Sequence, residues 1–167
     1  MRVEAKEQLS LIAELGIGFA GFLAIFLIFA RREGRFSPAD SVRVRAIIQS
    51  SFLAIFMALL PLLIMLSNVE AATLWRVSSV VHFAASATGA VVVGRQQFAL
   101  APSDRMEVGR LNNFIAWGLS LLQFLLLGTN AIGIGGDPSA LPYLGALVCI
   151  LGVATSNFVT IAVHRLL

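Results

Sequence analysis

The chain has 167 residues, of which 58% are hydrophobic and 13% are charged, and its formal net charge is +3. A water-soluble domain has about 45–50% apolar and about 25% charged residues, so this composition excludes a soluble globular protein. Long apolar runs alternate with short arginine-bearing segments, as in a chain that crosses a bilayer repeatedly. The arginines therefore serve membrane topology, and no nucleic-acid partner is expected.

Five apolar stretches are long enough to cross a hydrocarbon core of ~30 Å as helices of about 20 residues. They cover residues 9–30, 46–66, 74–93, 112–133 and 142–163. Backbone polar groups must be paired in lipid, and the alternation of barrel strands is absent, so each stretch is predicted to be a helix. The predicted fold class is an all-α bundle of five transmembrane helices, with residues 1–167 forming a single integral-membrane domain.

Lysine and arginine are distributed unequally between the two ends of these stretches. One side carries nine of them, and the other carries three, namely Arg2, Lys6 and Arg76. The positive-inside rule predicts that the N-terminus is outside and the C-terminus is cytoplasmic. Five arginines of the first long connection are candidates for lipid-headgroup contacts or serve only as the topology signal. They are Arg31, Arg32, Arg35, Arg43 and Arg45.

Two aromatic residues and one compositional bias bear on the location. Trp75 and Tyr143 fall at the predicted outer boundary, where amphipathic rings prefer to lie. Arginine greatly exceeds lysine, which is typical of a GC-rich bacterial genome. A multi-pass protein of the bacterial inner membrane is therefore expected.

Helix-start signals occur in both long connections. Ser37 is followed by Pro38 and Asp40, which predicts an N-cap, a proline in the first turn and an acid at the third helical position. Asp104 with Glu107 offers a similar N-cap. The second and fourth helices are predicted to begin before the membrane.

The chain also resembles itself. Residues 52–68 aligned on 114–130 share one phenylalanine, one alanine, three leucines and one asparagine. This pattern is consistent with a duplicated two-helix hairpin followed by a fifth helix. Leucine-rich helices also match by chance, and both explanations remain open.

Cofactor and catalytic motifs are absent from the sequence or lie in the wrong context. Residues 16–21 spell GxGxxG, but they lie inside an apolar span and lack the preceding strand of a dinucleotide site. His82 and His164 fall at different depths and cannot share a haem iron. No cofactor or metal is expected, and an enzyme is disfavoured. Glycines instead mark helix-packing faces: Gly18, Gly21, Gly89, Gly145 and Gly152.

Polar residues within the spans are the candidates for function, because an ionisable residue there costs ~2.5–3.5 kcal/mol on insertion. Glu14 and Arg76 are predicted to form an ion pair, and His82 lies on a small, partly polar face of the third span. An ion or solute pathway is predicted along the following residues. They are Glu14, Arg76, His82, Gln123, Asn130 and Asn157.

Two classes of function fit this pattern. The first is an oligomeric channel or transporter for an ion or small solute, with an outward-facing polar cluster. The second is a non-transporting accessory, assembly or sensor protein whose polar residues only hold helices together. The expected partners are the lipid bilayer and either further copies of the chain or another membrane subunit.

Overall fold

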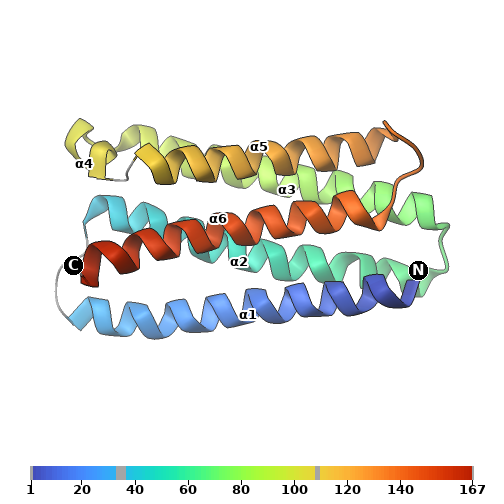
Figure 1. Cartoon of the computed structure of the whole chain (residues 1–167), viewed down its shortest axis with the longest axis horizontal. Helices are drawn as coiled ribbons and strands as arrows, with labels where there is room; N and C mark the ends of the chain where they lie inside the picture. Colours follow the sequence, from blue (N-terminus) through green and yellow to red (C-terminus); the bar gives the residue numbers. More distant parts are fainter. Residues whose placement is uncertain (1, 33–36, 108–109, 167) are drawn as a thin grey trace.

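The computed structural model describes residues 2–32, 37–107 and 110–166, except for the side chains of 2–4, 26–32, 105–107, 110 and 164–166. The described residues form five long helices and two short ones (Figure 1). The long helices are α1 (Arg2–Arg32), α2 (Pro38–Ile64), α3 (Ala71–Ala99), α5 (Arg110–Ile132) and α6 (Ala140–Leu166). The short ones are the 3₁₀ helix η1 (Met65–Ser67) and α4 (Pro102–Glu107). The described residues contain no strand, which confirms the predicted all-α class. Each long helix is apolar and long enough to cross a membrane, which indicates a multi-pass membrane protein.

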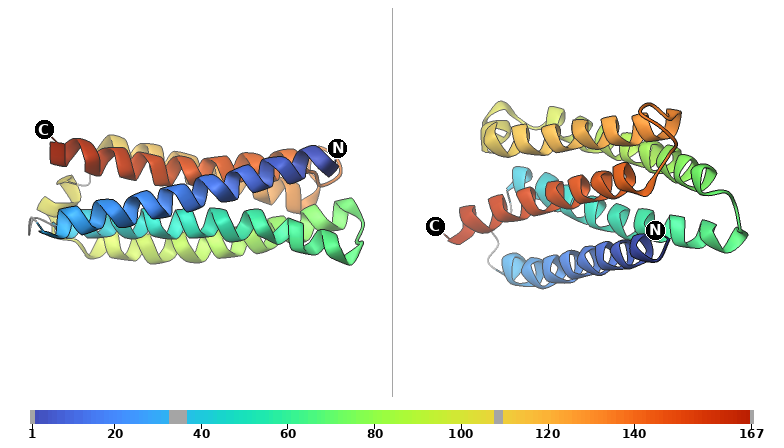
Figure 2. Two further views of the ribbon diagram at one scale, coloured as in Figure 1. Left: turned by 90° about the horizontal axis from the view of Figure 1, so that it is seen from below. Right: turned by 45° about the vertical axis from the view of Figure 1, so that its right-hand side comes forward.

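Four of the long helices form a ring. Around it, α2 contacts α3, α3 contacts α5, α5 contacts α6, and α6 contacts α2. The remaining helix, α1, packs on the outside of this ring against α2 and α6 (Figure 2, right). The start of α2, helix α4 and the end of α6 lie at one end of the bundle, here called the Arg-rich end (Figure 1). The opposite end, with η1 and the loop 133–139, is called the hairpin end.

Helix α2 begins where the sequence predicts. The Ser37 hydroxyl accepts a hydrogen bond from the Asp40 backbone N–H at 3.1 Å, and the Asp40 carboxylate accepts one from the Ser37 N–H at 3.4 Å. The same carboxylate pairs with the Arg43 guanidinium at 3.0 Å, and both side chains are buried. Arg43 is therefore turned into the bundle, whereas Arg45 is exposed. The side chains of Arg31, Arg32 and Arg35 lie outside the described residues.

Replacing Ser37 by alanine is expected to lower the free energy of unfolding by about 1 kcal/mol, because it removes the cap acceptor. Unfolding in mixed micelles by a denaturing detergent measures the change. Ser37→Asp, which keeps an acceptor, is the control and should be close to wild type. Equal losses in both variants would show that the cap hydrogen bond is not the cause.

The second helix start differs from its prediction. Helix α4 begins at Pro102, so Asp104 lies in its first turn and is not the N-cap. Helix α4 is described as far as Glu107, and α5 from Arg110. Proline explains the earlier start. It has no N–H group, but the N–H groups of the first helical turn have no partner within the helix, so proline is favoured at this position.

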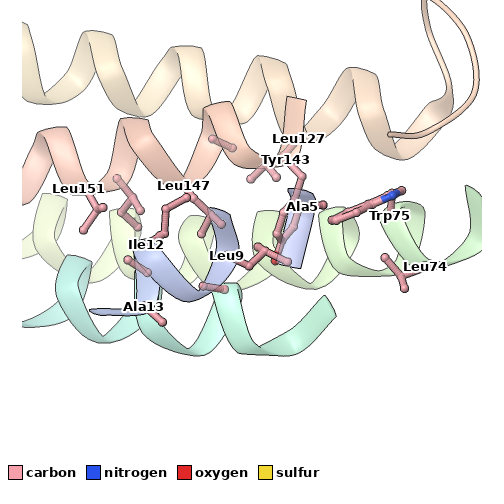
Figure 3. Close-up of a cluster of buried hydrophobic side chains, with 14 residues drawn as sticks. Ala5, Leu9, Ile12, Ala13, Leu74, Trp75, Leu127, Tyr143, Leu147 and Leu151 are labelled. Atoms are coloured by element: carbon pink, nitrogen blue, oxygen red, sulfur yellow. The ribbon is translucent and has the colours of Figure 1, made fainter. Parts of the chain in front are cut away.

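The apolar core lies toward the hairpin end, where α1, α2 and α6 meet. Leu9, Tyr143 and Leu147 are fully buried there and lie close together (Figure 3). Trp75 and Tyr143 are both buried in this cluster, with ring centroids 5.7 Å apart. Both rings therefore point into the bundle and do not face lipid, whatever their depth in the membrane.

A hydrogen bond between helices compensates for the proline inside α2. Pro61 has no N–H to donate to the Met57 carbonyl one turn earlier. The Tyr143 hydroxyl of α6 donates to that carbonyl instead, at 2.5 Å. Tyr143 is therefore the partner of the carbonyl that this proline leaves without a helical donor.

Candidate functional site

The inward face of α3 is polar or small over most of its length. After Trp75, its buried residues are Ser78, Ser79, His82, Ser86, Gly89 and Gly94. These positions recur at helical spacing, so they form one stripe that faces the other helices of the ring. The sequence predicts this stripe, and it gives the four-helix ring a polar interior on the α3 side.

His82, Ser86 and Gln123 form a buried cluster between α3 and α5. The Gln123 amide nitrogen lies 3.1 Å from His82 Nε2 and 2.7 Å from the Ser86 hydroxyl. With the Gln123 N–H₂ group as the donor of this contact, a neutral His82 accepts at Nε2 and has its proton on Nδ1. That Nδ1 has no hydrogen-bond partner among the described residues. The His82 ring also lies edge-on to Tyr143, with centroids 5.4 Å apart.

A central cavity of about 80 Å³ adjoins this cluster, is lined by α2, α3, α5 and α6, and is partly open to the surface of the bundle. It lies in the half of the bundle toward the Arg-rich end. Seven of its lining residues are polar, namely Gln49, Ser50, Ser86, Gln97, Ser120, Gln123 and Asn157. Among the described residues, no Asp, Glu, Lys, Arg or His lines it. The cavity is therefore polar but uncharged.

Some hydrogen-bonding groups in the cavity wall are not used by the protein itself. Neither the Gln49 amide nor the Ser50 hydroxyl has a hydrogen-bond partner in the described part of the chain. The Gln49 amide lies directly against Gly89, in the space that a Cβ would occupy. Gln49 is half-buried and Ser50 is buried. Because an amide or hydroxyl withdrawn from bulk water is expensive to leave unpaired, these two groups are suited to pair with water or a solute in the cavity.

Two further polar networks are closed. Asn112 donates to Asn157 at 3.2 Å and accepts from Ser156 at 2.6 Å, which joins α5 to α6 near the Arg-rich end. Near the hairpin end, the Asn130 amide donates to the Ser79 hydroxyl at 2.9 Å. It also forms two hydrogen bonds with the backbone of Ser139. These networks hold helices together.

Glu14 and Arg76 do not join the other candidates. Both side chains are exposed, and no ion pair links them in the described structure. The reason is that α1 packs on α2 and α6, whereas α3 lies across the ring from that surface. Of the predicted pathway residues, only His82 and Gln123 come together, and Gln123 and Asn157 line the cavity.

The glycines named from the sequence occupy three kinds of position. Gly145 and Gly152 face α5, where added Cβ atoms would lie 3.2 Å from a Leu126 methyl and 2.9 Å from a Leu119 methyl. Gly89 faces the cavity. Nothing lies within 4 Å of an added Cβ at Gly18 or Gly21, which are on the outer surface of α1.

The sequence reasoning missed most of the cavity wall. Gln49, Ser50, Ser86 and Ser120 were not among its predicted pathway residues, although all four lie within predicted spans. An amide at position 49 in an otherwise apolar stretch is a signal of the same kind as Gln123.

No protein-family model matches the chain, and no curated protein or solved structure is significantly similar to it. The site itself is therefore the basis for an assignment of function.

Proposed function

We propose that this chain is a membrane transport protein whose solute passes through the central cavity. The observation that carries the proposal is the set of unpaired hydrogen-bonding groups, Gln49 and Ser50, that face a hollow within a bundle of membrane length. Lipid offers such groups no partner, so buried polar residues in membrane bundles face one another, water or a substrate. A ring of four helices around one cavity favours a carrier over an open pore.

The orientation and the quaternary structure belong to the same proposal. With the N-terminus outside, the cavity lies in the cytoplasmic half, so the solute site is inward and not outward as the sequence alone suggested. The antiparallel pairs α1–α2 and α3–α5 are the proposed duplicated hairpins. Glu14 is exposed within the apolar segment Ala5–Ile25, a costly position against lipid. This supports an oligomer or a second membrane subunit at the outer face of α1.

A second candidate is the non-transporting accessory protein. The closed networks around Asn112 and Asn130 support this candidate. They join α5 to α6 and α5 to α3 by hydrogen bonds between side chains, which is a purely structural use of polar residues. This candidate treats the cavity as a packing defect filled by water.

Flux in proteoliposomes separates the two candidates. Purified protein is reconstituted, and the uptake of neutral solutes, cations, anions and protons is compared with uptake by empty vesicles. The transport proposal expects solute uptake that depends on the protein. Baseline uptake for the whole panel, with correctly inserted and folded protein, favours the accessory role.

Glu14→Gln is expected to leave this uptake within about twofold of wild type, because Glu14 lies on the outside of the bundle and away from the cavity. Uptake by the variant and the wild type is measured at equal protein density. Gln49→Leu, which changes the cavity wall, is the comparison and should reduce uptake. If Glu14→Gln instead abolished uptake in folded protein, the pathway would have to run along α1.

A further inference from the structure

We infer that the central cavity binds a small, uncharged solute that both donates and accepts hydrogen bonds, with urea-like amides as the chemical class. This inference rests on the proposed function for the solute's passage across the membrane. The binding itself depends only on the cavity. Three properties of the wall carry the inference, namely its lack of charge, its amide groups and its size.

The wall excludes an ion. Among the described lining residues there is no carboxylate, guanidinium, ammonium or imidazole to neutralise a charged ligand. An unpaired charge moved from water into such an environment loses several kcal/mol of solvation. The buried pair of Arg43 and Asp40 neutralises itself at 3.0 Å, and neither residue lines the cavity. A neutral ligand is the class that this wall tolerates.

The wall is rich in groups that donate and accept at once. Gln49 brings a carbonyl oxygen and an N–H₂ group, and Ser50 brings a hydroxyl. Gln123 brings its carbonyl oxygen, because its N–H₂ group already donates to His82 and Ser86. The amide of Gln49 and the hydroxyl of Ser50 have no partner within the described chain. A ligand with both N–H donors and a carbonyl acceptor satisfies both kinds of group, which a pure acceptor or an apolar molecule does not.

The size and the apolar walls limit the ligand further. A volume of about 80 Å³ has room for roughly five waters, which suits a compact molecule. Trp117 and Phe124 supply aromatic side chains to the same wall, against which a flat molecule can stack. Trp117 is 44% exposed, so one wall reaches the surface of the bundle and supplies a spectroscopic reporter at the site.

Matched pairs of probes test the inference by binding. Urea is compared with guanidinium, and acetamide with acetate, because each pair shares its shape and differs in charge. The readout is the fluorescence of Trp117 in a Trp75→Phe protein. Trp117→Phe, in which Trp75 is the only tryptophan, is the control. We expect urea and acetamide to change the Trp117 fluorescence saturably. Guanidinium and acetate should leave it unchanged. Gln49→Leu should weaken the affinity about tenfold, the effect of losing one good hydrogen bond.

Measuring the flux of the same four probes distinguishes the proposal of transport from the inference of neutral-solute binding. Urea binding without urea uptake would support the ligand class and contradict transport. Guanidinium or acetate uptake that Gln49→Leu abolishes would support transport and overturn the neutral-solute inference. The inference is also overturned if no neutral amide changes Trp117 fluorescence, or if Ser50→Ala and Gln49→Leu both bind urea as wild type does.

Discussion

Replacing Gly89 by leucine is expected to reduce solute uptake about tenfold or more, the effect of raising the barrier by ~1.4 kcal/mol. Gly89 has no side chain, and the Gln49 amide occupies the place of its Cβ at the cavity wall. A leucine there must displace this flexible amide, and its side chain takes up space at the wall of a cavity of about 80 Å³. Uptake in proteoliposomes at equal protein density measures the effect.

Gly118→Leu is the matched control for this prediction. Gly118 lies on the exposed surface of α5, and nothing is within 4 Å of an added Cβ there. The same substitution should leave uptake unchanged, since the new side chain meets no neighbour. Normal uptake by folded Gly89→Leu protein would show that the solute does not pass through the cavity.

Replacing Tyr143 by phenylalanine is expected to lower the free energy of unfolding by about 1–2 kcal/mol. The substitution keeps the buried ring and its contacts with Trp75 and His82, and removes only the hydroxyl. The Met57 carbonyl, which Pro61 leaves without a helical donor, then loses its interhelical hydrogen bond. Unfolding by steric trapping or denaturing detergent in bicelles measures the change.

A double-mutant cycle with Pro61→Ala tests the cause. Alanine at position 61 restores a backbone N–H that can donate to the Met57 carbonyl. In that background, Tyr143→Phe should destabilise by less than half as much as in wild type, because the carbonyl keeps one partner. Additive effects of the two substitutions would contradict the assignment of Tyr143 as the partner of the proline-freed carbonyl.

Much of the fold could be predicted because membrane-spanning helices are specified by composition and local signals. Apolar stretches of sufficient length fix the number and approximate bounds of the helices, and Ser37 with Asp40 fixes the start of α2. The need of the Pro61 turn for a partner also follows from local chemistry alone. Such features depend on residues within a few positions of one another.

The site could be predicted only in part, because sequence gives a residue's depth in the membrane more readily than the direction in which it points. Glu14 and Arg76 were paired by depth, but α1 packs outside the ring and both side chains are exposed. In a membrane protein the lipid-facing and core-facing sides of a helix are both apolar, so hydrophobicity does not tell them apart. The inward orientation of Trp75 and Tyr143 is not evident from the sequence for the same reason.

The inward residues were recognisable where small and polar side chains recur at helical spacing. This pattern indicates His82 on α3 and makes Gln123 a candidate. It does not predict the contact between Gln49 of α2 and Gly89 of α3. That contact depends on the packing of whole helices around the ring, which no local pattern encodes.

The reactivity of two adjacent engineered cysteines tests the central claim most directly. Ser50 lines the cavity, whereas Ser51 is fully buried outside it. In a Cys149→Ser background, Ser50→Cys and Ser51→Cys are treated in membranes with the small neutral reagent methyl methanethiosulfonate, which reacts with a hydrated thiolate. A cavity open to water and solute predicts modification of Ser50→Cys, with loss of uptake, and no modification of Ser51→Cys. Equal reactivity of the two, or none at either position, would contradict a solute pathway through the bundle.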